Sequence, residues 1–186
     1  MITLNAYSPT AVELTPAESS LYGQMDRVRQ ATNAGIRRWV TQWRDLLRGR
    51  VLDYGAGKPG TCRIPQPFRE ILNATDYVPW EPDDPEPSGA FDAILCTQVI
   101  QNFDMPHGRF FNFHGLLRNN GHLVLTYPVA WEEIEQEYFR YTQKGLWMLC
   151  HKAGLEIVQH ETLVRVAIDG SLTLNLVNGL VARRRQ

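Results

Sequence analysis

The sequence lacks the patterns that mark several large classes of protein. It has only three cysteines, Cys62, Cys96 and Cys150, which are far apart and form no Cys-x-x-Cys pair. Three scattered cysteines argue against a disulfide framework and against a zinc site, so we expect no bound metal and a reducing, cytoplasmic location. No segment approaches the roughly 18 consecutive apolar residues of a membrane-spanning helix. The first residues also lack the basic and apolar stretches of a secretory leader, so we expect neither a membrane span nor a leader.

An excess of charge of one sign is also missing. The chain has 19 lysine and arginine residues against 20 aspartate and glutamate residues, a formal net charge of -1. Proteins that bind nucleic acids or anionic membranes usually carry a clear positive excess, so neither partner is expected. The arginine run 183–185 is expected to be a solvated tail. With 186 residues, 44% of them hydrophobic, the chain can bury a core of its own and is expected to form one domain.

Residues 1–49 are predicted to form an arm followed by helices. The first fourteen residues show no regular pattern, and residues 15–18, Thr-Pro-Ala-Glu, then fit a helix start with a capping box. Apolar residues at steps of three and four over 36–47 predict an amphipathic helix that begins after Gly35 and ends at Gly49. These helices offer a surface through which a homodimer could form.

Residues 50–186 alternate between apolar, β-prone runs and helical patterns, with Asp104 and Thr142 as expected helix N-caps. This alternation predicts an α/β fold with three layers, similar to a Rossmann fold. Its sheet is expected to be mainly parallel, with about six strands and an antiparallel C-terminal hairpin that turns at 169–170. The predicted strands are 50–54, 74–78, 91–96, 122–128, 155–166 and 172–182, and the predicted helices are 67–72, 106–117 and 142–153.

The loop after the first of these strands is the candidate ligand site. Ligands of open parallel sheets bind beyond the carboxyl ends of the strands, and Gly55, Gly57 and Gly60 follow Asp53 at such an end. Glycine lets the backbone turn sharply and approach a ligand closely. Asp76, about twenty residues further on, could accept ribose hydroxyls at the end of the second strand. The same glycine spacing also satisfies the dinucleotide fingerprint, so the loop alone leaves two classes of nucleotide cofactor open.

Four segments between residues 50 and 160 resemble class I S-adenosylmethionine-dependent methyltransferases. Residues 51–57 (VLDYGAG) look like the cofactor-binding signature of that family, and 91–100 (FDAILCTQVI) like its fourth strand and the loop that leaves it. Residues 117–128 (LRNNGHLVLTYP) are similar to its helix, turn and fifth strand, and 138–158 to a block common in one branch. The resemblance implies methyl transfer from S-adenosylmethionine to an acceptor, most simply a small molecule.

The resemblance also implies roles around the glycine loop. In the family, the loop glycines pass close to the methionine part of the cofactor, and the acid before them organises the loop. An acid on the next strand holds the ribose, the residue after it covers the adenine, and the end of the fourth strand forms a floor near the sulfonium. The cofactor-binding residues implied in this way are Asp53, Tyr54, Gly55, Gly57, Asp76, Tyr77, Cys96, Thr97 and Gln98.

Four residues are candidates for the walls of the acceptor pocket: His107, Tyr127, Trp131 and Tyr138. The alternative for His107 is a solvated side chain at a helix start, and the alternative for the aromatic residues is ordinary packing. The acidic run over 132–137 would suit an amine or cationic acceptor if it lines the pocket, and is otherwise a solvated face. No catalytic residue is assigned, because an in-line displacement gains mainly from alignment. A general base is needed only when the acceptor carries a proton.

Departures from the family pattern keep two alternatives open. The segment between Asp76 and Phe91 is short where the family has a helix, a further strand and an acid that contacts adenine. The pair Gln101-Asn102 also replaces a common Glu-His pair. Both changes fit a protein that keeps the methyltransferase fold and serves as a non-catalytic binding or assembly module. The second alternative is a nicotinamide-dependent oxidoreductase, which the glycine spacing permits but the short chain disfavours.

Overall fold

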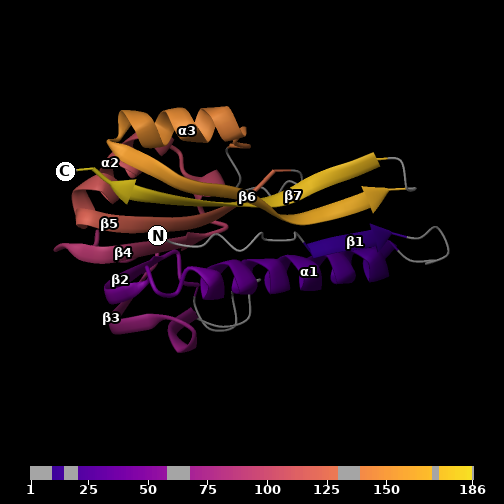
Figure 1. The fold of residues 1–186 in the computed structure, drawn as a ribbon, viewed down its shortest axis with the longest axis horizontal. Helices are drawn as coiled ribbons and strands as arrows, with labels where there is room; N and C mark the ends of the chain where they lie inside the picture. The colour runs from indigo at the N-terminus through magenta and orange to yellow at the C-terminus, as the bar shows by residue number, and fades with distance from the viewer. Residues whose placement is uncertain (1–9, 15–20, 58–67, 130–138, 169–171, 186) are drawn as a thin grey trace.

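One mixed sheet of seven strands forms the centre of the molecule (Figure 1). The computed structural model describes residues 10–14, 21–57, 68–129, 139–168 and 172–185. In chain order the strands are β1 Thr10–Leu14, β2 Arg48–Tyr54, β3 Asn73–Trp80, β4 Phe91–Thr97, β5 Leu117–Pro128, β6 Leu155–Ile168 and β7 Leu172–Arg184. Their order across the sheet is β1-β6-β7-β5-β4-β2-β3.

Helices cover both faces of this sheet, which makes three layers (Figure 1). α1, Leu21–Gln42, packs on one face, and α2, Pro106–Leu116, and α3, Gln143–Lys152, pack on the other. Two single turns of 3-10 helix, Phe68–Glu70 and Ile100–Asn102, lie before β3 and after β4. The predicted α/β class and Rossmann-like layering are therefore confirmed.

The strands β5, β4, β2 and β3 run parallel to one another. Consecutive residues in their centres, such as Leu52 and Val51 or Ile94 and Leu95, are fully buried. A parallel sheet with helices on both faces buries both sides of each strand, which explains these continuous apolar runs. The antiparallel hairpin of β6 and β7 continues past the end of β5, and in Figure 1 it extends alongside β1 and α1.

All six predicted strands are present, and β1 is a seventh that the sequence did not reveal. Its five residues lie in the stretch expected to be irregular, and they pair in parallel with residues 164–168 of β6. Strand formation depends on the partner edge as much as on local sequence. The partner here is about 150 residues away along the chain, so the segment 10–14 carries too little local signal to be recognised.

The first helix differs from the prediction at both ends. α1 runs without interruption through 33–35 and ends at Gln42, whereas a helix from 36 to 47 was expected. A Cβ on Gly35 would lie 2.8 Å from Val164 Cγ2, so this glycine marks close packing on β6 and not a break in the helix. Hydrogen-bonded turns follow α1, and Gly49, the expected helix stop, lies within β2 with φ of +73°.

The other expected helix signals had mixed outcomes. The Thr142 side chain accepts a hydrogen bond from the backbone N–H of Gly145 at 3.1 Å, which confirms it as the N-cap of α3. The N-cap of α2 is Met105 and not Asp104, whose carboxylate instead accepts from the Met105 N–H at 2.8 Å. The helix start at 15–18 and the turn at 169–170 lie outside the described residues. None of the described helices is long and apolar enough to cross a membrane.

Candidate functional site

The glycine loop after β2 is held against the end of β3. The backbone N–H groups of Gly55 and Ala56 donate to the Trp80 carbonyl at 2.8 and 3.2 Å. The next donor, the N–H of Gly57, bonds to the carboxylate of Glu81, the first residue after β3. These bonds bring the carboxyl ends of two parallel strands together, which is where open sheets bind their ligands.

Both loop glycines have a backbone that side chains disfavour. Gly55 has φ of +78° and Gly57 has φ of +81°, in the left-handed region that glycine adopts without steric cost. At Gly55 there is also no room, because a Cβ would lie 2.4 Å from Val99 Cγ2 on the loop that leaves β4. The glycines are therefore required by the shape of the loop itself.

Asp53 lies beneath this loop with 1% of its surface exposed. Its Oδ2 accepts a hydrogen bond from the Tyr77 hydroxyl at 2.5 Å, and its Oδ1 has no hydrogen-bond partner among the described residues. Burial raises the pKa of Asp53 to about 6, although the Tyr77 hydrogen bond acts in the opposite direction. The pKa of Tyr77 is raised above its usual range by burial and by Asp53, so its hydroxyl remains a donor.

Asp76, the expected ribose ligand, does not reach this edge of the sheet. It lies within β3 opposite Arg50, and its carboxylate forms an ion pair with Arg50 Nε at 3.1 Å. Trp80, at the end of the strand, is four positions further along the chain, a distance of about 13 Å at the usual rise per residue. Glu81 occupies the position at which the acid was expected. The sequence reading missed it because β3 continues two residues beyond Val78, where the strand was expected to end.

The last residues of β4 and the residue that follows it form the side of the site next to the loop. Cys96 is fully buried and Thr97 nearly so. Burial raises the pKa of the Cys96 thiol well above its usual value, so the thiol stays neutral. Gln98 has φ of +55°, and its backbone N–H and side chain bond to the Thr126 carbonyl at 3.0 Å and hydroxyl at 3.2 Å. A non-glycine residue held in this region stores strain, a feature concentrated at functional sites.

Gln101 lies beside the candidate site, although the sequence analysis did not assign it a binding role. Its Nε2 donates to the Gln98 carbonyl at 2.7 Å, which supports the strained backbone. The residue is 4% exposed, and its Oε1 has no hydrogen-bond partner among the described residues. This buried acceptor stands at the position where one branch of the family has a glutamate, so the departure from the family pattern was the available signal.

The side chains of Tyr54 and Tyr77, both expected to contact the cofactor, make other contacts in the structure. The Tyr54 ring packs on Trp80 with centroids 4.2 Å apart and on Phe113 at 4.9 Å, inside the core formed with α2. Only the backbone of Tyr54 is left to face a ligand at the loop. The Tyr77 hydroxyl is engaged by Asp53, so this ring would have to leave that bond to move over an adenine.

The acceptor-pocket candidates are not brought together by the described residues. Tyr127 is fully buried, and its hydroxyl lies 2.7 Å from His160 Nε2 and 3.3 Å from Asn178 Nδ2. His107 is exposed in the first turn of α2. Trp131 and Tyr138 lie outside the described residues, as does the acidic run. No group of three or more metal-ligating side chains occurs in the described part of the chain.

A family model described as a methyltransferase domain matches residues 26–160. The chain belongs to this methyltransferase family. The membership confirms the expected resemblance and the cofactor that goes with it, S-adenosylmethionine, and it disfavours the nicotinamide-dependent alternative. No curated protein matches the chain in sequence.

Solved structures of this methyltransferase fold are similar in architecture at low sequence identity. The magnesium protoporphyrin IX methyltransferase of Synechocystis PCC 6803, with bound SAH, has a TM-score of 0.55 and 14% identity and covers 89% of each chain. The N-methyltransferase NodS of Bradyrhizobium japonicum WM9 has a TM-score of 0.55 and 14% identity, over 83% of this chain and 98% of its own. The [4+2]-cyclase SpnF has a TM-score of 0.56 and 17% identity, over 84% and 82%. These likenesses establish the fold.

The described residues around the glycine loop are compatible in their chemistry with the sugar and methionine parts of S-adenosylmethionine. The left-handed glycines allow close approach of a ligand, and Glu81 places beside Gly57 a carboxylate of the kind that accepts hydrogen bonds from ribose hydroxyls. Asp53 Oδ1 and Gln101 Oε1 are buried acceptors with capacity for a further hydrogen bond. The adenine side is shorter: residues 81–90 lead directly from β3 to β4, and in the described residues β3 is the last strand of the sheet.

Proposed function

We propose that the protein is an enzyme that transfers a methyl group from S-adenosylmethionine to a small-molecule acceptor, with the cofactor held at the carboxyl ends of β2, β3 and β4. The observation that carries this proposal is the glycine loop, which is pinned to the end of β3 and places Glu81 beside Gly57. Family membership and the Rossmann-like fold support the same reading. A cytoplasmic location is part of the proposal.

In this proposal the residues of the site bind and orient the cofactor and take no part in bond making. Glu81, in place of Asp76, accepts hydrogen bonds from the ribose hydroxyls of the cofactor. The backbone of residues 54–57 lies against the methionine part of the cofactor. Asp53 holds the loop from below through its bond to Tyr77. Thr97 and Gln98 form the floor, with Cys96 buried behind them. When bound, the cofactor supplies a methyl group on a positively charged sulfur, and the chain contributes alignment of the acceptor with that group.

The residues around the site favour an acceptor that needs no strong base. Gln101 cannot take a proton at physiological pH, and Cys96 and Tyr127 are buried with pKa values raised by that burial. His160, bonded to Tyr127, has its pKa lowered by burial and is therefore neutral near pH 7. An acceptor atom with a free lone pair, such as a neutral amine, would meet these conditions. His107, Tyr127, Trp131 and Tyr138 remain the proposed surroundings of this acceptor.

A second candidate function is a non-catalytic role for the same fold. The direct connection of residues 81–90 favours it, because this loop leaves little protein to cover an adenine. The neighbour SpnF is a [4+2]-cyclase, so this architecture also carries other reactions.

Calorimetry separates these readings. We expect saturable binding of S-adenosylhomocysteine with one site per chain, and transfer of label from methyl-labelled S-adenosylmethionine to small molecules from a cell extract. No heat at millimolar S-adenosylhomocysteine would contradict cofactor binding. Binding without any transfer would favour the non-catalytic role. Tight NADH binding would revive the oxidoreductase alternative.

A further inference from the structure

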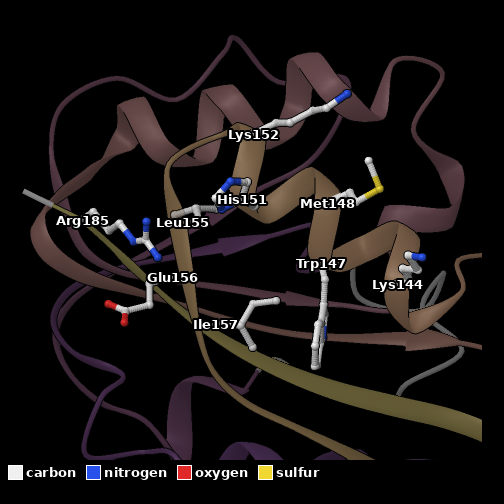
Figure 2. Close-up of a pocket in the computed structure, with 9 residues that line it drawn as sticks. All are labelled: Lys144, Trp147, Met148, His151, Lys152, Leu155, Glu156, Ile157 and Arg185. Atoms are coloured by element: carbon white, nitrogen blue, oxygen red, sulfur yellow. The ribbon is translucent and has the colours of Figure 1, made fainter.

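A groove with a volume of about 390 Å³ lies between α3 and the first residues of β6. Figure 2 shows the side chains that line it, which come from one side of α3, from residues 155–157 and from Arg185 near the end of the chain. Leu155 pairs with Arg184, next to the amino ends of the parallel strands, so most of the groove lies far from the glycine loop. None of the residues assigned to the cofactor lines it.

The floor of this α3 groove is apolar and exposed. Trp147 is 44% exposed and Met148 is 51% exposed, and Ile157 lies beside the Trp147 ring (Figure 2). The Trp147 ring also lies edge-on to the ring of His160, with centroids 6.4 Å apart. Large apolar side chains fixed at a surface are typical anchors of binding sites, since aromatic residues and methionine are enriched there.

The rim of the α3 groove is positive. Lys144 and Lys152 stand near the two ends of α3, about 12 Å apart along the helix at its usual rise. Arg185 adds a third cation at the far end of the groove (Figure 2). Glu156, an acid in the lining, already accepts a hydrogen bond from Arg183 at 2.7 Å. Positive charge therefore dominates here, although the whole chain has a net charge of -1.

The apolar floor and the positive rim together select among four kinds of occupant. A second copy of the chain, docked through the same surface by two-fold symmetry, would bring like cations together. A ligand with one anionic head could neutralise one end of the groove and not the other. A flat bilayer would not fill a concave surface. A polypeptide with apolar side chains and several carboxylates satisfies both the floor and the rim.

We propose that the α3 groove docks an acidic, amphipathic segment of a partner protein. Apolar side chains of the segment pack on Trp147, Met148 and Ile157, and its carboxylates face Lys144 and Lys152. Such recognition of an amphipathic segment by an apolar groove is a common mode of protein association. The proposal is separate from methyl transfer and does not depend on it.

The test uses the full chain and a defined probe. A fluorescein-labelled synthetic peptide of fifteen residues, with leucine and glutamate at helical spacing, is titrated by anisotropy, and its partner peptide has lysine in place of glutamate. We expect micromolar binding of the glutamate peptide only, weakened by added salt. Trp147→Ala, and separately the double change Lys144→Glu with Lys152→Glu, should each weaken binding about tenfold or more.

Two variants outside the α3 groove serve as matched controls. Phe111→Ala removes another exposed aromatic side chain, and Arg44→Glu reverses another exposed charge, so both should bind the peptide as the unchanged protein does. Equal binding of both peptides, no binding at millimolar peptide, or an equal loss in the control variants would overturn the proposal. Binding to phosphatidylserine vesicles that is lost in the groove variants, without peptide binding, would assign the groove to a membrane surface instead.

Discussion

Polar side chains at the two ends of the parallel strands differ in their burial and in their hydrogen-bond partners. At the amino ends, charges are exposed and paired, as in the Arg50–Asp76 ion pair at 3.1 Å. At the carboxyl ends, Asp53 and Gln101 are buried, and each has an oxygen without a hydrogen-bond partner in the described residues. A buried acceptor left open costs free energy. Such positions persist where a ligand or ordered water completes them. Buried nitrogens without a hydrogen bond also occur near the amino ends, at Arg50 Nε and Arg184 Nε. Each of those guanidinium groups still has a partner, Asp76 or the Leu117 carbonyl, so the open carboxylate and amide oxygens are the feature that marks the carboxyl end.

The largest expected effect is at the loop of the carboxyl end. Gly55→Ala places a Cβ 2.4 Å from Val99 Cγ2 at a φ of +78°. The left-handed backbone alone costs an alanine about 1–2 kcal/mol, and the clash adds to it. We expect urea unfolding to show a loss of about 2 kcal/mol or more, and calorimetry to show at least a hundredfold weaker binding of S-adenosylhomocysteine.

Gly108→Ala is the matched control for that change. Gly108 lies in α2, and a Cβ there meets nothing within 4 Å. Alanine favours a helix over glycine by up to about 1 kcal/mol, so this variant should be equally or more stable and should bind cofactor normally. A loss at Gly108 as large as that at Gly55 would remove the distinction between the two sites.

The second effect, on stability and not on cofactor binding, is the pH dependence that Asp53 confers. Burial raises its pKa from 3.8 to about 6. Between these pH values Asp53 is ionised in the unfolded chain but keeps its proton in the folded chain. The contribution of Asp53 to the free energy of unfolding therefore falls as pH rises from about 4 to about 6 and is level above that. The loss is about 3 kcal/mol at about 1.4 kcal/mol per pKa unit. Asp53→Asn should therefore gain stability relative to the unchanged protein over this range, measured by urea unfolding at several pH values.

A carboxylate at the amino end of the strands should show the opposite slope. Asp92 accepts hydrogen bonds from the Arg50 N–H at 2.8 Å and from Arg118 at 2.7 Å, and its pKa is lowered, first by the backbone bond. Its stabilising effect is present above the unfolded pKa and is lost as pH falls through the lower folded value. Asp92→Asn should therefore be less stable than the unchanged protein at neutral pH, with the difference shrinking in acid. A parallel pH profile for the Asp53 and Asp92 variants would contradict the comparison.

The smallest effect is expected from the exposed ion pairs of the amino end. Arg118→Ala removes a partner whose side chain is 53% exposed. Exposed pairs contribute about 0–1 kcal/mol and are screened by salt. Thermal unfolding should change by a few degrees at most, less at high salt, and cofactor affinity should stay unchanged. A loss of cofactor binding in this variant would link the two ends of the sheet.

The sequence predicted the fold well because the parallel strands carry their own signal. Runs such as 93–96 are apolar on both sides, and Thr142 caps α3 through a local bond. The errors arose where distant contacts decide. β1 depends on its pairing with β6, and Gly35 is required by Val164, a residue about 130 positions away. Local sequence cannot report either contact.

The site was predicted only in part for a similar reason. Gly55, Gly57 and Asp53 follow from a local motif and lie together. Choosing between Asp76 and Glu81 requires the length and register of β3, and a shift of a few residues moves a carboxylate to the other end of the strand. The hydrogen bond from Gln101 to the Gln98 carbonyl depends on a left-handed backbone at Gln98, and the residue type at that position does not predict this conformation.

The most direct test compares these two carboxylates in one experiment. The dissociation constant of S-adenosylhomocysteine is measured by calorimetry for the unchanged protein, Glu81→Gln and Asp76→Asn. Glutamine keeps an oxygen for the Gly57 N–H but loses the charge that strengthens hydrogen bonds to ribose, so Glu81→Gln should bind about tenfold more weakly or worse. Asp76→Asn should bind within about twofold of the unchanged protein, since Asp76 is paired with Arg50 away from the loop. A loss at Asp76 with none at Glu81 would contradict the account.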